Sequence, residues 1–587
     1  MTLHRALAPS VLALVLLGVL AAAGPAAGAD LSFLSVVPTE DGWQAEVEGR
    51  RAHKDAASLQ LLADGVALEV TAEALDKGRA RLVARGGVDA ERLVLARAAK
   101  KGPEQLAALD LVDRGRFSGW TVYHIMLGYF RNGNPGSDGE VDSWRHANWA
   151  GGDLQGVLEK ADYLDELGVD AVWLSPLFLS ATSHGYDVLD YYRPGDQYAV
   201  PDDAEASRAL LRQVIEALHA RDIRVVLDLP LNHAHRAYDR DAGDPSGHGP
   251  RMTGPRQDAE KLWHSWGSSY GYWNVDDAAT RRFLKEVALH YLVEVGVDGL
   301  RLDYVRGVEH AFWSELYAEV KAQKPDAWLL GEAWIDDAGA EVNAADIALY
   351  YEPVDGAPQF DSLIDFPMQI LATEIIARGG KARGLEEWLQ EAEVQYGDAA
   401  EPAFFLDNHD LTRFLSWTDE PARLRTALGF LASLSNPLIV FYGTETGLAN
   451  AGPKPGFLDA GRLAMPWDSL DQALLGHVRA VFAARAAHAS LHAGGRLPLF
   501  ADDESMVFAK IGPPDAGGGA REIAFVGVHL GSEPRALDLA VGRLVSGNGP
   551  VDAVLGAGAT IEDGRLRWTL PPFTTSIAIR PANQPPE

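Results

Sequence analysis

Hydrophobic and polar positions in the middle of the chain follow two alternating patterns. Short, mostly apolar runs typical of buried strands occupy residues 122–127, 169–174, 224–229, 297–302, 327–330, 403–406 and 438–442. Amphipathic stretches lie between them, as in 204–220, where Leu210, Leu211, Val214 and Leu218 recur at helical spacing. Apolar strands alternating with amphipathic helices predict a parallel sheet covered by helices. About eight such units predict an α/β fold, a (β/α)8 TIM barrel, which we place at residues 114–495.

The region before the barrel, residues 30–113, has a different pattern. Polar and apolar residues alternate with a period of two at 43–48, 68–71 and 79–83, with Gly or Asp-Gly turns between the runs. This alternation predicts an N-terminal β-sandwich module. The module contains no motif, so a carbohydrate-binding role and a purely structural role are both open.

Two further segments depart from the barrel pattern. Strand-like runs at 506–511, 522–528 and 575–579 predict a C-terminal all-β domain at 496–587. Within the barrel, residues 232–276 are polar and rich in Gly, Pro and Trp, and the segment is too long for an ordinary βα loop. We expect it to form an inserted loop subdomain over the active face.

The first 29 residues have the features of a signal peptide. Arg5 provides a charged start, residues 11–23 are apolar, and Ala27-Gly28-Ala29 forms a small-residue cleavage pattern. The alternative, a transmembrane anchor, needs around twenty apolar residues, and here prolines and glycines bound a shorter run. We therefore expect an exported protein, secreted or periplasmic, with no membrane attachment after cleavage.

Charge and cysteine content narrow the function further. The 587 residues include 52 Lys and Arg against 83 Asp and Glu, a formal net charge of −31. Nucleic acid and anionic membranes both require clustered positive charge, so neither is expected as a main partner. The chain has no cysteine, which excludes disulfides, and the sequence does not determine its oligomeric state.

Three acidic residues stand at the ends of expected barrel strands. Asp303 ends the run 299–303, Glu332 follows Gly331, and Asp410 follows the run that ends near 406. Each alone could be a helix cap or a solvated loop residue. The C-terminal ends of barrel strands meet at one mouth, so the three carboxylates are expected to converge there. With Arg301 two residues before Asp303, they indicate a catalytic site.

These segments resemble the conserved regions of glycoside hydrolase family 13, the α-amylase family. Residues 228–233, 299–303, 331–334 and 406–410 resemble its first to fourth regions in order. Further signatures occur in matching order at 168–176, 184–187 and 441–445. The resemblance covers about 117 to 490 and implies a TIM-barrel glycoside hydrolase that acts on an α-glucan oligo- or polysaccharide, with no organic cofactor.

The resemblance also implies the catalytic roles. Retaining hydrolysis uses two carboxyl groups about 5–5.5 Å apart, one as nucleophile and one as general acid/base. By resemblance Asp303 is the nucleophile and Glu332 the acid/base. Asp410 would be the third carboxylate, binding sugar hydroxyls and keeping Glu332 protonated through like-charge proximity.

Six further residues are implied as substrate-binding: Tyr186, His184, Asp228, His233, Arg301 and His409. Tyr186 would stack on the sugar, and the two histidines 233 and 409 would hydrogen-bond it. Arg301 would keep Asp303 ionised, because a nearby cation favours the charged form. Asp228 would mainly orient its neighbours.

Some positions depart from the family pattern and bear on specificity. Arg306 and Gly307 stand where many α-amylases have Lys-His, and Ser183 stands where many α-glucosidases have an acid. Residues 359–366 and the N-terminal module resemble the neopullulanase and cyclomaltodextrinase branch. The main hypothesis is hydrolysis of α-1,4 bonds in starch or maltodextrins. The alternatives are a neopullulanase-like, cyclomaltodextrinase-like or transglycosylating enzyme and, more remotely, a non-catalytic glucan-binding protein.

A calcium site is expected after the first barrel strand. Carboxylate, amide and backbone oxygens at turn-rich spacing suit Ca²⁺, which takes six to eight oxygen ligands. The pattern resembles the calcium loop of the neopullulanase branch, and the implied ligands are Asn132, Asn134, Ser137, Asp138, Gly151 and Asp153. The alternative is an Asx/Gly turn without metal.

Overall fold

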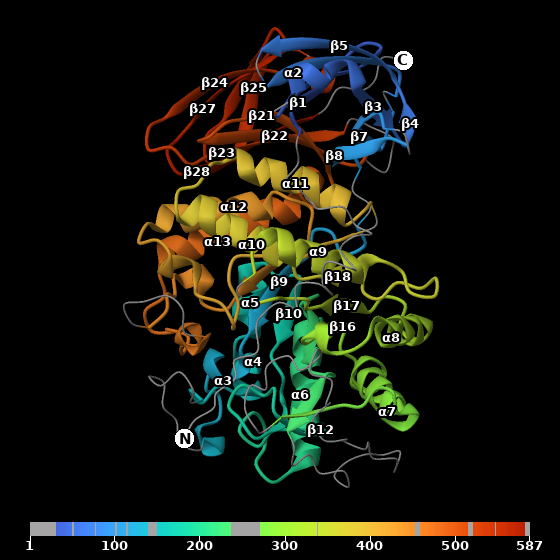
Figure 1. Ribbon diagram of the computed structural model, residues 1–587. Coiled ribbons are helices and arrows are strands. Elements are labelled where there is room, and N and C mark those ends of the chain that lie inside the picture. The colour runs from blue at the N-terminus through green and yellow to red at the C-terminus, as the bar shows by residue number, and fades with distance from the viewer. Residues whose placement is uncertain are drawn as a thin grey trace, which may run out of the picture.

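A computed structural model gives the architecture of the chain (Figure 1). It describes residues 31–49, 52–76, 78–87, 89–99, 102–112, 115–138, 149–235, 270–336, 338–398, 400–451, 458–514, 521–545 and 547–581. The expected signal peptide and most of the expected insertion at 232–276 lie outside these residues. Among the described residues, no helix combines the length and apolarity needed to cross a bilayer.

Eight parallel strands form the barrel, which confirms the predicted fold class. In sheet order they are β18 (Ser362–Leu363), β17 (Trp328–Gly331), β16 (Gly299–Leu302), β13 (Arg224–Leu229), β10 (Ala171–Leu174), β9 (Thr121–Ile125), β20 (Leu438–Phe441) and β19 (Phe404–Phe405). A parallel bridge between Ile364 and Ala403 joins the two ends of this order and closes the barrel. β18 is the strand that the hydrophobic pattern missed, because two residues are too few to form a recognisable apolar run.

Helices cover the barrel as the amphipathic pattern predicted. They are α3 (Leu127–Phe130), α4 (Leu154–Glu159), α5 (Ala161–Leu167), α6 (Ala204–His219), α7 (Ala278–Leu289), α8 (His310–Gln323), α9 (Ala340–Tyr351), α10 (Phe366–Ala372), α11 (Arg383–Gln395), α12 (Pro421–Ala432), α13 (Gln472–Ala487) and α14 (Ala489–His492). The α6 helix illustrates the sequence logic. The Asp203 side chain accepts from the Ala206 N–H and caps the first turn, while Leu211, Val214 and Leu218 face the core.

The N-terminal region forms two four-stranded antiparallel sheets around a shared core. One is β1 (Ser32–Pro38), β2 (Gly42–Glu48), β6 (Arg79–Arg85) and β5 (Glu69–Asp76), and the other is β4 (Val66–Ala67), β3 (Leu59–Ala63), β7 (Arg92–Arg97) and β8 (Glu104–Asp110). A short helix, α2 (Ala52–Asp55), connects them. The two-residue alternation predicted by the sequence places one face of β6 in the core, where Ala80, Leu82 and Ala84 are buried.

The C-terminal domain is antiparallel. Its strands are β21 (Gly495–Ala501), β22 (Ser505–Ile511), β23 (Glu522–His529), β24 (Arg535–Ala540), β25 (Gly549–Leu555), β26 (Ala559–Glu562), β27 (Arg565–Leu570) and β28 (Thr574–Pro581). The N- and C-terminal domains share one hydrophobic core, with Leu31 and Val36 in the same cluster as Leu497 and Phe525. Figure 1 shows both domains at one end of the barrel, beyond α11, with β12 (Val188–Pro194) at the opposite end.

Long loops emerge from the C-terminal ends of the barrel strands. After β10, the strands β11 (Phe178–Ser180) and β12 form a two-stranded antiparallel sheet that carries His184 and Tyr186 between them. After β13, β14 (His233–His235) pairs with β15 (Tyr270–Tyr272), so the two ends of the expected insertion lie side by side. These excursions place several predicted site residues over the mouth of the barrel.

Candidate active site

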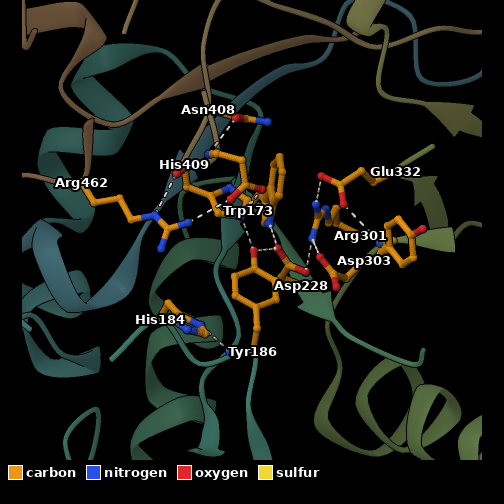
Figure 2. A network of polar contacts seen from close by, with 12 residues as sticks. Trp173, His184, Tyr186, Asp228, Arg301, Asp303, Glu332, Asn408, His409 and Arg462 are labelled. Carbon is orange, nitrogen blue, oxygen red and sulfur yellow. Dashed lines mark hydrogen bonds and ion pairs between the residues drawn. The ribbon is translucent and has the colours of Figure 1, made fainter. Parts of the chain in front are cut away.

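The predicted catalytic residues lie at the C-terminal ends of three barrel strands. Asp303 follows β16, Glu332 follows β17, and Asp410 lies in the loop after β19. Figure 2 shows Asp303 and Glu332 around the guanidinium of Arg301, with His409 and Tyr186 across the site. Asp303 and Glu332 are almost wholly buried, so their charges act in a medium that screens them weakly.

Arg301 connects the acidic residues of the site. Its Nη1 lies 2.7 Å from Asp303 Oδ1 and 2.8 Å from Asp228 Oδ1, and its Nη2 is paired with Glu332 Oε1. The guanidinium is 0% exposed. Burial alone would lower the pKa of Arg301, but the surrounding carboxylates outweigh it and hold the pKa well above its usual value. Asp303 and Glu332 bind two nitrogens of one guanidinium, so their carboxyl groups lie close to each other.

Glu332 has the environment of a general acid. Its pKa is raised to about 8. Burial is the main cause, the positive charge of Arg301 opposes it, and the negative charges of Asp303 and Asp410 add to the rise. The Tyr304 N–H donates to Glu332 Oε2 at 3.1 Å. Tyr304 adopts a left-handed backbone with φ of 44°, a costly conformation for an aromatic residue, and this conformation directs the N–H toward the carboxyl group. The raised pKa favours the acid form of Glu332 near neutral pH, and the Tyr304 N–H holds its carboxyl group in place.

A hydrogen-bond network orients Tyr186 beside the acids. The Tyr186 hydroxyl donates to Asp228 Oδ2 at 2.8 Å and lies 2.8 Å from His409 Nε2, and the two rings are parallel. The Tyr186 hydroxyl donates its one proton to Asp228, so in the second contact His409 Nε2–H donates to the phenol oxygen. His409 is therefore assigned as the tautomer with the proton on Nε2. Asp228 also accepts from Trp173 Nε1 at 3.0 Å. Asp228 is fully buried, so it positions Tyr186 and Arg301, as the sequence suggested, and does not face the cleft.

The two other predicted histidines also lie at the mouth. The Tyr186 N–H donates to His184 Nδ1 at 3.2 Å, which leaves the proton on Nε2, 3.7 Å from Asp187 Oδ2. Burial lowers the pKa of His184 to about 3 and lowers that of His233, which lies near the Asp303 charge. Both imidazoles are neutral at physiological pH and can donate or accept hydrogen bonds with sugar hydroxyls.

Sequence reasoning missed Arg462. Its Nη2 lies 2.9 Å from Asp410 Oδ1, and its Nε donates to the His409 carbonyl at 2.8 Å. Arg462 comes 52 positions after Asp410 and lies in none of the family signatures. This separation corresponds to no contact within one helix or one strand. No signal in the single sequence could have found it. Arg462 fixes the third carboxylate as Arg301 fixes the first.

The expected calcium residues are brought together, although Asp153 has another role as well. Asp153 caps α4 by accepting from the Gly156 N–H, and it also accepts from the N–H groups of Gly133 and Asn134. Asn132 Nδ2 donates to Asp138 Oδ2 at 2.7 Å. The remaining oxygens, Asn132 Oδ1 and Asp138 Oδ1, are buried and have no hydrogen-bond partner among the described residues. Two buried acceptors without donors fit a cation.

The other expected ligands line the same loop. Ser137 Oγ donates to the Asn134 carbonyl at 2.8 Å. Gly151 has φ of 84°, and a Cβ at this position would lie 2.5 Å from Asn132 Nδ2, so only glycine fits against the amide. Among the described residues, no group of three or more His, Asp or Glu side chains could hold a metal ion. Any cation in this loop would therefore depend on amide, hydroxyl and backbone oxygens in addition to carboxylates.

A closed parallel barrel with a carboxylate pair and a third acid at its C-terminal mouth defines a barrel glycoside hydrolase. The profile of the family described as "Alpha amylase, catalytic domain" matches residues 125–266 and 264–473, which together make up more than half of the chain. The chain belongs to this family, the α-amylase family, glycoside hydrolase family 13. The resemblance read from the sequence motifs is thereby confirmed.

Several named proteins are similar to this chain in sequence. A cyclomaltodextrinase from a Bacillus species is 28% identical over 434 residues, covering 67% of this chain and 70% of that protein. A maltogenic alpha-amylase from Bacillus acidopullulyticus is 28% identical, covering 66% of each chain. Neopullulanase 2 from Thermoactinomyces vulgaris is 29% identical, covering 56% of this chain and 57% of its own. The chain thus spans less than two thirds of the length of the last two relatives.

Solved structures agree in fold. An Anoxybacillus alpha-amylase superimposes with a TM-score of 0.66 at 27% identity, covering 80% of this chain and 99% of its own. A cyclomaltodextrinase superimposes with a TM-score of 0.67 at 20% identity and covers 93% of this chain and 98% of its own, a likeness of fold alone.

Proposed function

We propose that this enzyme hydrolyses α-1,4-glucosidic bonds with retention of configuration by double displacement. The observation that carries the proposal is the position of Arg301, whose guanidinium binds both Asp303 and Glu332. This places the Asp303 carboxylate beside a second carboxyl group whose pKa is raised to about 8. One nucleophile and one acid at short spacing are what a retaining glycosidase requires.

The first step forms a glycosyl-enzyme. An Asp303 oxygen attacks the anomeric carbon, the bond to the leaving oxygen breaks, and the Glu332 proton passes to that oxygen. In the second step, the Glu332 carboxylate takes a proton from water, whose oxygen attacks the same carbon and releases Asp303. One water is consumed, Glu332 regains its proton, and the two inversions give the α-anomer. Asp410, held by Arg462, and His409 are available to bind the hydroxyls of the sugar.

We further propose that small or cyclic maltodextrins are preferred over starch, as in the cyclomaltodextrinase and neopullulanase branch. The names of the relatives support this preference. The two residues Arg306 and Gly307, which follow the strand that ends at the nucleophile, support it as well. A Cβ at Gly307 would lie 2.0 Å from Asn232 Oδ1, so no bulkier side chain fits there unless Asn232 moves. Arg306 is held away by its ion pair with Asp346 at 2.8 Å. The leaving-group side therefore lacks the Lys-His pair of many α-amylases.

Initial rates on cyclomaltodextrin, pullulan and soluble starch test this specificity. We expect the highest kcat/KM on cyclomaltodextrin and detectable cleavage of pullulan. The highest value on soluble starch would favour an ordinary α-amylase instead. No cleavage of any of the three, with Asp303→Asn as the background control, would favour the non-catalytic, glucan-binding alternative.

We propose Ca²⁺ in the loop after β9, held by oxygens of Asn132, Asn134, Ser137, Asp138, Gly151 and Asp153. The two buried oxygens without donors, Asn132 Oδ1 and Asp138 Oδ1, support the assignment. A bound ion would fix this loop in place and stabilise the folded state by mass action. It would take no part in bond cleavage.

Melting with and without EDTA tests the calcium proposal. Asp153→Ala is a poor probe, because Asp153 caps α4 whether or not metal binds. In Asp138→Asn, we expect the calcium-dependent rise in Tm to be lost while the Tm in EDTA stays near that of the parent protein. A parent protein that contains no calcium by elemental analysis and whose Tm does not change in EDTA would overturn the assignment.

We also propose that the chain is exported and that residues 1–29 are removed. The charged start, apolar run and small-residue cleavage pattern support this proposal. Sequencing the N-terminus of protein recovered outside the cytoplasm should give Asp30. An intact Met1 on protein that stays in the cytoplasm would contradict it.

A further inference from the structure

A second cavity opens at the end of the barrel opposite the catalytic mouth. It has a volume of about 660 Å³ and is lined by residues from all three domains, among them Asp110 of β8, Ala392 of α11 and Arg496 of β21. The barrel residues that line it, such as Asp361 and Asn436, precede strands β18 and β20. The catalytic residues follow their strands, so the cavity and the cleft are separated by the length of the barrel. Ligand pockets typically measure about 300–1,000 Å³.

Aromatic residues gather at this cavity and not on the N-terminal domain. Phe33 and Trp43 are the only aromatic residues between positions 31 and 112, and they are 1% and 4% exposed. The N-terminal domain therefore offers no aromatic surface on which a sugar could stack. The cavity, in contrast, is lined by Tyr317, Tyr351, Phe360 and Tyr396, and the first two are only half-buried. Apolar ring faces beside polar groups are suited to the flat, hydroxylated faces of pyranose rings.

Two of the acidic groups in the cavity wall, Asp361 and Glu401, already accept hydrogen bonds from protein donors. Asp361 accepts from the Tyr317 hydroxyl at 3.2 Å, the Leu329 N–H at 2.8 Å and Lys321 Nζ at 2.8 Å. Glu401 Oε1 accepts from the Phe117 N–H at 2.7 Å. Asp110 and Glu393 also line the cavity, and they pair with Arg92 at 2.6 Å and Arg496 at 3.8 Å. These four carboxylates are all paired with protein groups, which favours an uncharged occupant.

Arg496 contributes a charged donor to the cavity wall. Its Nη1 donates to both oxygens of Glu386 at 2.5 and 2.7 Å. Its Nη2 is 3.8 Å from Glu393 Oε1 and has no hydrogen-bond partner among the described residues, although the side chain is 6% exposed. Arg496 lines the cavity, and a ligand hydroxyl that reached this nitrogen would give it a hydrogen bond. The charge of Arg496 is balanced by Glu386, so the ligand need not be an anion.

The walls of the cavity are held rigidly by α11. Gln390 Oε1 accepts from the Phe33 N–H at 2.8 Å, and its Nε2 donates to the Phe33 carbonyl at 2.9 Å, which fixes β1 to the helix. Arg92 Nη2 donates to the Glu393 carbonyl at 2.7 Å, which fixes β7. A cavity with rigid walls binds its ligand without a large ordering cost.

We infer that this cavity is a second binding site for a short maltooligosaccharide, distinct from the catalytic cleft. The choice of glucose units rests on the proposed function, since α-glucan is the carbohydrate that the enzyme would meet. The N-terminal domain then contributes as one wall of the site and as a structural clamp, and does not bind carbohydrate on its own surface.

Calorimetric titration of full-length Asp303→Asn with maltotriose tests the inference. We expect two binding events per chain, one of which persists when His409→Ala is added to weaken the cleft. Ala392→Trp should fill the cavity and weaken this second event at least tenfold, and Tyr317→Ala should do the same by removing a ring. Leu349→Trp is the matched control, because it introduces the same tryptophan side chain at an exposed position of α9 outside the cavity lining.

The outcomes separate the second site from the catalytic proposal. A single event in Asp303→Asn, abolished by His409→Ala, would overturn the second site and leave the proposed hydrolysis intact. Two events that both survive Tyr317→Ala and Ala392→Trp in folded protein would also overturn it. Failure of the wild-type chain to cleave α-glucans would refute the proposed function, while maltotriose binding at the cavity would still be decided by the same variants.

Discussion

Arg462 Nη2 lies 2.9 Å from Asp410 Oδ1, so an arginine 52 residues further along the chain holds the third carboxylate of the site. A hydrogen bond to a charged group contributes about 1.5–3 kcal/mol, and 1.4 kcal/mol corresponds to a factor of ten. We expect Arg462→Met to lower kcat/KM on maltooligosaccharides by roughly 10- to 100-fold, because Asp410 loses its orientation.

A surface ion pair provides the control for Arg462. Arg479 Nη2 lies 2.9 Å from Glu166, with both side chains substantially exposed. Exposed pairs contribute about 0–1 kcal/mol, so Arg479→Met should leave kcat/KM unchanged. Equal losses in the two variants would mean that the Arg462 pair has no specific role in the site.

The alkaline limit of activity should report Glu332. Its pKa is raised to about 8 from the usual 4.5, so the acid form persists through neutral pH and is lost as pH rises through 8. Asp410 contributes to this rise by its negative charge. Asp410→Asn should therefore shift the alkaline limb of the kcat/KM profile to lower pH, in addition to reducing the rate. An unchanged limb would assign it to a different group.

The same raised pKa has a consequence for stability. The folded state binds the Glu332 proton more tightly than the unfolded state, so folding takes up a proton between about pH 4.5 and 8. Stability falls as pH rises through this window, relative to a chain in which the group cannot ionise. In Glu332→Gln we expect a smaller loss of Tm from pH 5 to pH 8 than in the parent protein. The same Tm difference in both would contradict the assignment.

The nucleophile and the acid should respond differently to the leaving group. Asp303→Asn should lose nearly all turnover on every substrate, because an amide cannot form the glycosyl-enzyme, while maltotriose binding remains. Glu332→Gln should lose about 10²- to 10⁴-fold on maltooligosaccharides. It should lose much less on an aryl maltoside whose phenolate leaves without protonation. Steady-state kinetics on the two substrate types distinguish the roles. Equal losses of Glu332→Gln on both substrates would contradict its assignment as the general acid.

Gln390 on α11 should stabilise the attachment of the N-terminal domain. Gln390→Ala leaves the buried N–H and carbonyl of Phe33 without their partners, at a cost of about 1–3 kcal/mol for an unsatisfied group. We expect a lower Tm with little change in KM. The control is Gln395→Ala on the same helix. Among the residues that the structure describes, its amide hydrogen-bonds to Glu391 alone, so its loss should matter little. A Tm loss confined to Gln395→Ala would contradict the role of Gln390 in attaching the N-terminal domain.

The sequence predicted the barrel because apolar strands and amphipathic helices leave periodic patterns. It also placed Asp303, Glu332 and Asp410 at the mouth of the barrel, because each follows a strand whose end is recognisable. It missed β18, which has only two residues, and Arg462, which reaches Asp410 through a contact that has no spacing along the chain. The role of α11 was equally hidden, since Gln390 and Arg496 contact segments more than a hundred positions away.

The anomeric form of the first product tests the central claim most directly. The proposed double displacement at an α-linked glucan releases the α-anomer. Proton NMR of maltoheptaose with high enzyme concentration, recorded before mutarotation, should show the α-anomeric signal growing first. The β-anomeric signal growing first would mean a single displacement by water and would contradict the assignment of Asp303 as nucleophile.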